Sequence, residues 1–203
     1  MEARSTNLLF MDNMKLPFFP PEMLDMPHLK GISMCDNRLS ELDPIIGTFT
    51  NLTALHLDRN MLQLLPASVG NLSKLTTISL DGNEMLDPPA EIMMLAEKDA
   101  QELVVYLKKI RSAEVTNSLD LHGYMLRTIP YSVSMLTNLT HLSLAENRIT
   151  ELPAFIATLS KLQTLLLSGN QLDQLPGEVA RLQALEELNI DNNMFKEVPR
   201  PLL

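Results

Sequence analysis

Tryptophan is absent from this 203-residue chain, and cysteine occurs only once, at Cys35. Seven glycines and 13 prolines are far too few for a collagen-like or low-complexity chain. A single cysteine cannot build a disulfide scaffold. Disorder is excluded as well, because 45% of the residues are hydrophobic and only 20% are charged. These absences leave a globular protein with a substantial apolar core.

Positive charge and long apolar runs are also scarce. Lys and Arg number 16 against 25 Asp and Glu, which gives a formal net charge of −9. We therefore expect neither nucleic acid nor an anionic membrane as a partner, since both attract basic surfaces. No apolar run approaches the ~20 residues of a membrane span, and the N-terminus carries an acid where a secretion signal has bases. Together with the single cysteine, this predicts a cytoplasmic protein.

Leucine is the most frequent residue, with 40 copies, and most of them occupy fixed positions of a repeating frame. Six asparagines recur with a constant 23-residue spacing in two runs of three, and they are Asn37, Asn60 and Asn83, then Asn147, Asn170 and Asn193. Apolar residues stand 8, 5 and 3 positions before each asparagine and 2 positions after it. One further step back from Asn37 and from Asn147 reaches Met14 and Tyr124 in the same frame. The chain therefore contains eight repeats in two blocks of four, in which Asn83 of the first block corresponds to Asn193 of the second.

The spacing has a direct physical meaning. Leu-x-Leu alternation makes a short strand with one buried face. The asparagine closes that strand, and its amide can serve the backbone groups of neighbouring turns as a ladder. No repeat can bury its own leucines, so each depends on its neighbours in the stack.

The pattern Leu-x-x-Leu-x-Leu-x-x-Asn-x-Leu-x-x-Leu-Pro resembles the leucine-rich repeat family, and the 23-residue length is similar to its intracellular, Ras-associated type. The resemblance implies an α/β solenoid with a parallel sheet on the concave face and an irregular or helical convex face. It divides the chain into repeats 1–4 (residues 1–89), an amphipathic helix insert (90–112) and repeats 5–8 (113–203). It also implies a non-enzymatic scaffold that binds a partner protein in intracellular signalling, without a cofactor. The alternative is the recognition or regulatory arm of a larger kinase, GTPase or ubiquitin ligase.

The insert separates the two blocks, because the interval between Asn83 and Tyr124 is nearly twice the length of one repeat. Its apolar residues fall on one helical face and its charges complement the helix dipole, which predicts one helix over about 90–111. We expect this helix to pack on the convex side of repeat 4, the alternative being a docking helix for a partner groove. We also expect the sheet to continue from repeat 4 to repeat 5.

Only side chains between the buried positions can face a partner on the concave side. Those chosen as partner-binding candidates are Phe10, His56, Asp58, Arg59, Asp81, Asp120, His141, Leu166 and Asp191. Four members of one row, Cys35, Asp58, Asp81 and His122, are metal-ligating types, but side chains in a flat row point in parallel whereas zinc needs converging ligands. Ser33, His56 and Asp58 suggest a catalytic triad, but a regular sheet offers no oxyanion hole. We therefore predict neither a metal site nor a catalytic site.

The two ends complete the expectations. The last repeat runs through Val198 to Leu203 without an amphipathic segment after it, and about five residues precede the first repeat. Solenoids need polar caps over their terminal cores. This predicts either a fragment or short form of a longer repeat protein, or end-to-end self-association through uncapped termini.

Overall fold

The computed structural model describes residues 7–199, and these form two compact units that divide between Arg111 and Ser112. Unit 1 contains the first block of repeats and unit 2 the second. The predicted uncapped termini include residues 1–6 and 200–203, and these lie outside the described residues. Each unit is described by itself below.

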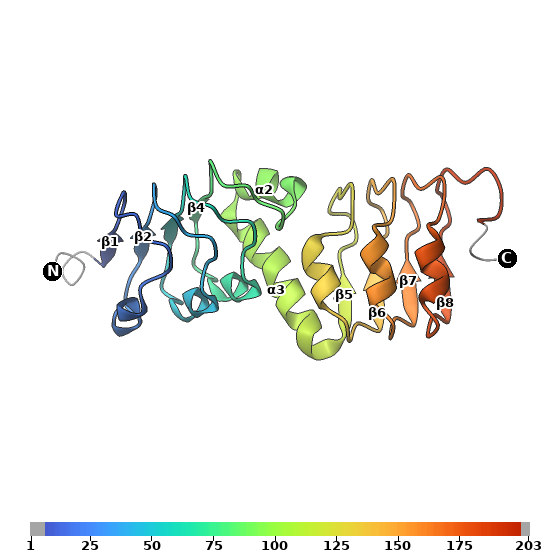
Figure 1. Cartoon of the computed structure of the whole chain (residues 1–203), viewed down its shortest axis with the longest axis horizontal. Helices are drawn as coiled ribbons and strands as arrows, with labels where there is room; N and C mark the ends of the chain where they lie inside the picture. Colours follow the sequence, from blue (N-terminus) through green and yellow to red (C-terminus); the bar gives the residue numbers. More distant parts are fainter. Residues whose placement is uncertain (1–6, 200–203) are drawn as a thin grey trace. The chain divides into compact units, whose positions relative to one another are not determined.

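Unit 1 has a four-stranded parallel sheet in the order β1-β2-β3-β4 (Figure 1). Each strand has three residues, and they are β1 (Leu8–Phe10), β2 (Gly31–Ser33), β3 (Ala54–His56) and β4 (Thr77–Ser79). The register advances by one repeat at each step, so that Phe10 pairs with Ser33 and Ser33 with His56. Every repeat therefore places the same frame position in the same row.

Unit 2 repeats this arrangement with a second four-stranded parallel sheet, β5-β6-β7-β8. Its strands are β5 (Ser118–Asp120), β6 (His141–Ser143), β7 (Thr164–Leu166) and β8 (Glu187–Asn189). The expectation that one sheet continues from repeat 4 to repeat 5 is therefore wrong. The reason is that two helices, and not a single bulge, intervene between β4 and β5 in the chain.

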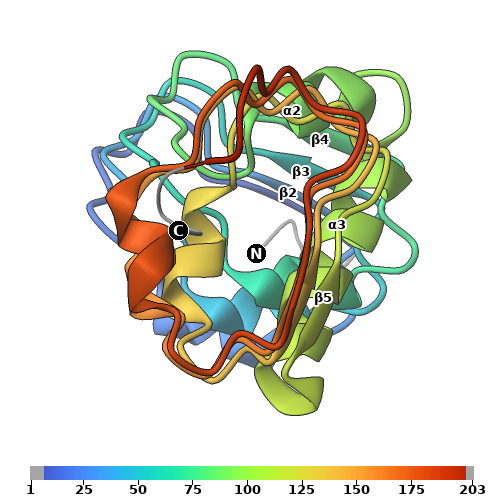
Figure 2. The ribbon, with the colours of Figure 1, turned by 90° about the vertical axis from the view of Figure 1, so that its right-hand side faces the viewer.

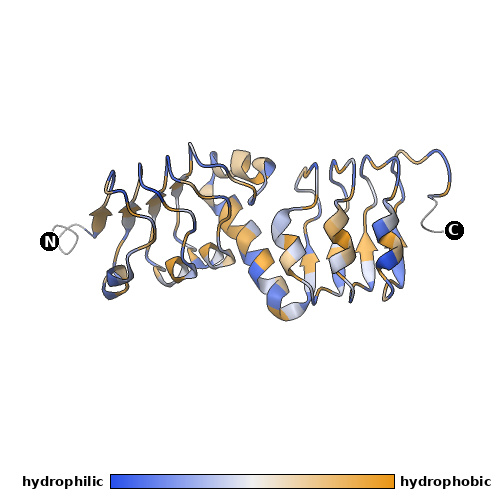
Figure 3. Cartoon of the chain, in the orientation of Figure 1, coloured by the Kyte–Doolittle hydropathy of each residue, from blue (hydrophilic) through white to orange (hydrophobic). Residues whose placement is uncertain are grey.

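Short 3-10 helices form the second layer of the repeats. They are η1 (Pro21–Asp25), η2 (Pro44–Thr48), η3 (Ala67–Asn71), η4 (Tyr131–Met135), η5 (Ala154–Thr158) and η6 (Gly177–Arg181). Five of the six follow a proline at the N-cap position, whose fixed φ suits a helix entry, and Asp43 caps the sixth by accepting the N–H of Ile45. In unit 2, η4 to η6 lie across the repeats from the strands (Figure 2). Hydrophobic residues recur in every repeat and fill the space between the layers (Figure 3).

The ladder asparagines connect each turn to the preceding repeat. Asn60 Nδ2 donates to the carbonyls of Met34 and Leu57, both at 2.9 Å, and its Oδ1 accepts the N–H of Leu39 at 3.0 Å. The other five make the equivalent bonds at the same offsets. Four of the six are buried, whereas the last of each block, Asn83 and Asn193, is half-buried.

The insert consists of two helices, α2 (Ala90–Ala96) and α3 (Ala100–Thr116), so the prediction of one helix over 90–111 is wrong. Asp99 is the cause of the break, because its Oδ1 accepts the N–H of Gln101 and begins a new helix. Helix α3 then continues past the predicted end. It stops at Asn117, which adopts a left-handed φ of 56° and donates its N–H to the carbonyl of Ala113.

Within unit 1, helix α3 packs against η3. A Cβ on Gly70 would lie 2.5 Å from the backbone nitrogen of Lys108, so glycine is required for this close approach. The Gln101 side chain donates to the carbonyl of Leu75, and the hydroxyl of Tyr106 donates to the buried carboxylate of Asp87 at 3.0 Å. The apolar face of α3 is buried, which leaves it closed to a partner's groove.

The two blocks share unusual backbone positions as well as sequence. Asn7 and Asn117 both have left-handed φ values, of 57° and 56°, and so do Lys15 and Met125, of 58° and 59°. Both pairs are separated by the same offset that relates Asn83 to Asn193. No helix among the described residues is long and apolar enough to cross a membrane.

Candidate functional site

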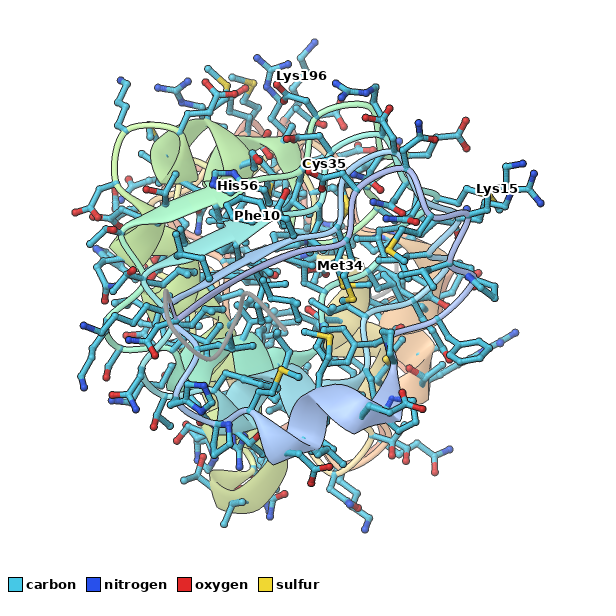
Figure 4. All side chains as sticks on the ribbon, turned by 90° about the vertical axis from the view of Figure 1, so that its left-hand side faces the viewer. Phe10, Lys15, Met34, Cys35, His56 and Lys196 are labelled. Carbon is cyan, nitrogen blue, oxygen red and sulfur yellow. The ribbon has the colours of Figure 1, made fainter. Side chains whose placement is uncertain are left out.

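The outward side chains of the unit 1 sheet form two parallel rows. The strands end in the row Phe10, Ser33, His56 and Ser79, and the row Asp12, Cys35, Asp58 and Asp81 follows two positions later. Phe10 is 68% exposed. Figure 4 shows Phe10, Cys35 and His56 in this part of unit 1. We call the two rows the strand face of unit 1.

Asp12 fixes one end of the strand face. Its Oδ1 accepts the hydroxyl of Ser33 at 2.6 Å and the backbone N–H of Cys35 at 2.7 Å. Both donors come from the next repeat along the chain. A carboxylate that accepts two such bonds is held in one orientation, because charge-assisted hydrogen bonds are the stronger kind.

Asp58 makes the equivalent bonds two repeats later. Its Oδ2 accepts the hydroxyl of Ser79 at 2.7 Å, and its Oδ1 accepts the backbone N–H of Asp81 at 2.8 Å. The thiol of Cys35 donates to the same carboxylate at 3.5 Å. His56 Nδ1 lies 2.9 Å from Ser79 Oγ. Because Ser79 gives its only proton to Asp58, His56 is the donor in this last bond.

Ser33, His56 and Asp58, which the sequence analysis considered and rejected as a triad, do not form the hydrogen-bond chain that a triad needs. The hydroxyl of Ser33 donates to Asp12 and makes no bond to His56. Ser79, which does contact His56, gives its proton to a carboxylate rather than to the imidazole. Burial also raises the pKa of the Cys35 thiol, which keeps that group protonated at neutral pH.

Arg59 lies beside the strand face and is bound to Asp36 of the preceding repeat. The guanidinium makes a two-pronged contact, with Nε 2.5 Å and one terminal nitrogen 2.6 Å from the two carboxylate oxygens. Hydrogen bonding to this guanidinium lowers the pKa of Asp36, and the same carboxylate raises the pKa of Arg59. A partner that uses Arg59 must compete with Asp36.

The sequence analysis did not predict the left-handed backbone of the residue that precedes each ladder position. The residue before the ladder position has a left-handed φ in all eight repeats, and the set is Asn13, Asp36, Arg59, Gly82, Gly123, Glu146, Gly169 and Asn192. The recurrence of glycine and asparagine was the available signal, because these residues tolerate that conformation best. At Arg59 the side chain also lies against the next repeat, since a Cβ on Gly82 would come within 3.0 Å of Arg59 Cγ.

The remaining candidates belong to unit 2. Asp120 and Leu166 occupy the strand-end row, His141 begins β6, and Asp191 lies two positions beyond β8. Asp120 accepts the N–H of His122, and His141 Nδ1 lies 2.8 Å from the hydroxyl of Thr140. The structure therefore brings Phe10, His56, Asp58 and Asp81 into one face, with Arg59 beside it. The four candidates of unit 2 belong to a separate sheet.

The sheet break also divides the row that contained the metal-ligating types. Cys35, Asp58 and Asp81 follow the strands of unit 1, whereas His122 follows β5 in unit 2. Among residues 7–199, no three His, Cys, Asp or Glu side chains come together as a group that could hold a metal ion.

Comparison with solved structures gives 323 matching chains. One is a leucine-rich repeat protein of Leptospira interrogans, with 32% identity and a TM-score of 0.47, covering 93% of this chain and 43% of that one. Another is the ectodomain of the Arabidopsis thaliana receptor kinase GASSHO1/SCHENGEN3 in complex with CASPARIAN STRIP INTEGRITY FACTOR 2, with 25% identity and a TM-score of 0.40, covering 98% and 22%. A third is the functional domain of InlJ from Listeria monocytogenes, with 22% identity and a TM-score of 0.38, covering 89% and 33%. The chain spans less than half the length of each.

No curated protein matches the chain. The family model described as "Leucine rich repeat" matches residues 21–85 and 137–195, which together make up more than half of the sequence. Domains of this family are generally non-catalytic and serve as scaffolds for protein–protein interaction. The two parallel sheets with one strand per repeat agree with that match. The chain belongs to the leucine-rich repeat family.

Proposed function

We propose that this chain is a non-enzymatic scaffold that binds a partner protein on the strand face of unit 1, with Phe10 as the apolar anchor. The observation that carries the proposal is the 68% exposure of Phe10 in a strand-end row whose other members, Ser33, His56 and Ser79, are polar. Exposed aromatic side chains at the centre of an interface supply most of its binding energy. The candidates His56, Asp58, Arg59 and Asp81 lie on or beside this face.

The hydrogen bonds of the strand face support the same proposal. Asp12 and Asp58 hold Ser33 and Ser79, and Ser79 holds His56, before any partner arrives. Side chains that are already ordered lose less conformational entropy on binding. The outward face of unit 2, with Asp120, His141, Leu166 and Asp191, is the second candidate surface.

The setting of this interaction is part of the proposal. We propose a cytoplasmic role in intracellular signalling, which rests on the acidic composition and the single cysteine. Subcellular fractionation of the source cell tests the location, and recovery of the chain in a secreted fraction would contradict it.

End-to-end self-association is a further expectation. The first described repeat exposes Met14 to 58%, and the last exposes Met194 and Val198 to 57% and 61%. Apolar side chains of this size favour association when they remain uncovered. Sedimentation equilibrium over a range of concentrations tests this, and a mass that stays at one chain throughout would contradict it.

The binding experiment compares Phe10→Ala with Phe18→Ala as its matched control. Both residues are aromatic, strongly exposed and in the first repeat, but only Phe10 lies on the sheet. Each tagged variant is used to isolate partners from the source cell, with quantification by mass spectrometry. We expect partners recovered with the wild type to be lost with Phe10→Ala and retained with Phe18→Ala. Equal recovery with both variants would contradict the assignment of the strand face.

A further inference from the structure

Strand β4 is the last strand of the unit 1 sheet, and the pair Asp81–Gly82 follows it. In the three preceding repeats, the residue before the ladder position donates its N–H to a carbonyl of the next repeat, as Arg59 does to Asp81 at 2.6 Å. Among residues 7–199, the N–H of Gly82 makes no hydrogen bond. An unpaired backbone donor of this kind is expected at the edge of a sheet.

The carboxylate of Asp81 is unpaired for the same reason. Asp12 and Asp58 each accept a hydroxyl and a backbone N–H from the following repeat. Because the sheet ends at β4, the Asp81 carboxylate accepts no hydrogen bond within the described part of the chain. Asp81 and Gly82 are both exposed. The end of the sheet therefore leaves a side-chain carboxyl and the adjacent backbone nitrogen unpaired together.

These two groups can react with each other. The nitrogen of Gly82 attacks Cγ of Asp81 and forms a C–N bond, and the carboxyl in its acid form loses its hydroxyl while the nitrogen loses its hydrogen, so that one water molecule leaves. Water then adds to one of the two carbonyls of the resulting cyclic imide and breaks the bond of that carbonyl to the nitrogen. Addition at the side-chain carbonyl restores aspartate, whereas addition at the main-chain carbonyl leaves the chain running through Cβ and Cγ as isoaspartate. No oxidant, reductant or enzyme takes part.

We propose that Asp81 is a site of spontaneous conversion to isoaspartate. It is the only aspartate that precedes a glycine in the sequence, and a glycine has no Cβ to obstruct the approach of its nitrogen to Cγ. Ring closure requires rotation about the Cα–C bond of Asp81, which breaks the bond from the Arg59 N–H to the Asp81 carbonyl. The N–H of Gly82 has no hydrogen bond to lose in this rotation.

Two aspartates at the same frame position provide internal comparisons. Closure at Asp58 would break the bond of the Arg59 N–H and three hydrogen bonds on the Asp58 carboxylate. Because bonds to charged groups are the stronger kind, we expect Asp58 to convert at least about tenfold more slowly than Asp81. Asp191 follows β8, the last strand of the unit 2 sheet, but precedes Asn192. It should also convert more slowly than Asp81, because Asn192 carries a Cβ.

The test incubates the full chain at neutral pH and physiological temperature for several weeks. Isoaspartate is then measured by mass spectrometry of tryptic peptides, with a fragmentation method that distinguishes it from aspartate of equal mass. Asp81 lies in the tryptic peptide 75–98, whose other aspartate, Asp87, precedes a proline. The proline nitrogen has no hydrogen to lose, so Asp87 cannot form the imide. Isoaspartate in this peptide therefore reports Asp81 alone.

The variant Gly82→Asn tests the role of the glycine, with Gly123→Asn as its matched control. Both glycines precede the ladder position with left-handed φ values, of 73° and 74°, and asparagine has the same conformation at Asn192. A Cβ on Gly82 would meet the Arg59 side chain, which is exposed and can move, and a Cβ on Gly123 would meet no atom within 4 Å. We expect conversion of Asp81 to slow at least about tenfold in Gly82→Asn, because the new side chain hinders ring closure. It should be unchanged in Gly123→Asn.

Four results would overturn the proposal. They are the absence of isoaspartate at Asp81 after incubation, equal rates at Asp81 and Asp58, an undiminished rate in Gly82→Asn, and an equal loss in Gly123→Asn. Equal circular dichroism spectra of the wild type and both variants verify that all three are folded. The reaction needs no partner, so these results do not depend on partner binding at the strand face of unit 1.

Discussion

Replacing Asn60 by alanine removes a side chain that serves three backbone groups at once. The N–H of Leu39 loses its acceptor, whereas the carbonyls of Met34 and Leu57 lose one of two donors and keep Asn37 and Asn83. Asn60 is only 7% exposed, so water cannot easily replace the amide. The variant therefore leaves one buried backbone donor without a partner, which is far more costly than losing a hydrogen bond at the surface.

The magnitude follows from the number of groups and their burial. The Leu39 N–H left without a partner costs about 1–3 kcal/mol, and each of the two carbonyls loses a second hydrogen bond worth about 0.5–1.5 kcal/mol, so we expect a loss of about 2–5 kcal/mol. Asn83 provides a matched control because it bonds to Leu62, Leu57 and Leu80 with nearly the same lengths. Asn83 is half-buried, and water can take over part of its role. We expect Asn83→Ala to cost about 1 kcal/mol.

Urea unfolding followed by circular dichroism measures the free energy of unfolding of both variants. Hydrogen exchange at the Leu39 amide adds a local readout, because repeat arrays need not unfold in one step. Exchange at Leu39 should be much faster in Asn60→Ala than in Asn83→Ala. The reasoning is refuted if the two variants lose the same stability, or if Asn60→Ala loses less than about 1 kcal/mol.

Three other predictions concern packing, reactivity and charge. Gly70→Ala places a methyl group against the backbone of Lys108 and should weaken the packing of α3 on η3. Hydrogen exchange along α3 should therefore become faster, whereas Gly177→Ala, whose methyl group would meet no atom within 4 Å, should leave it unchanged. Cys35 should react with iodoacetamide more slowly than free cysteine at neutral pH, because burial raises its pKa, and equal rates would contradict this. Because the pKa of Asp36 is lowered, the small contribution of its pair with Arg59 is present above the ordinary carboxyl pKa and lost as pH falls through the folded value. The urea midpoints of wild type and Asp36→Asn should therefore converge in acid and in high salt, and a difference that persists there would contradict the assignment.

The repeat frame was predictable because its physics is local to a single repeat and its immediate neighbours. Alternating apolar residues before each asparagine specify a strand, and the family match and the two sheets confirm the predicted leucine-rich repeat fold. The backbone of the turn was partly readable as well. Gly82, Gly123 and Gly169 share one frame position, which is typical of a left-handed residue.

The insert and the strand face depended on interactions that a periodic pattern does not contain. The apolar stripe of the insert continues through Asp99, so it could not show that the side chain of Asp99 caps a second helix. The periodic pattern also did not show that Asp12 and Asp58 accept hydrogen bonds from the following repeats. These contacts depend on side-chain rotamers and on the register between strands, and both are fixed only in the folded chain.

The most direct test of the proposed function is the comparison of Phe10→Ala with Phe18→Ala in partner capture from the source cell. The two side chains are 68% and 60% exposed, so a loss of nonspecific hydrophobic binding affects both variants alike. If the strand face of unit 1 binds the partner, Phe10→Ala releases it and Phe18→Ala retains it. Retention by both variants, or loss from both, would contradict the proposal.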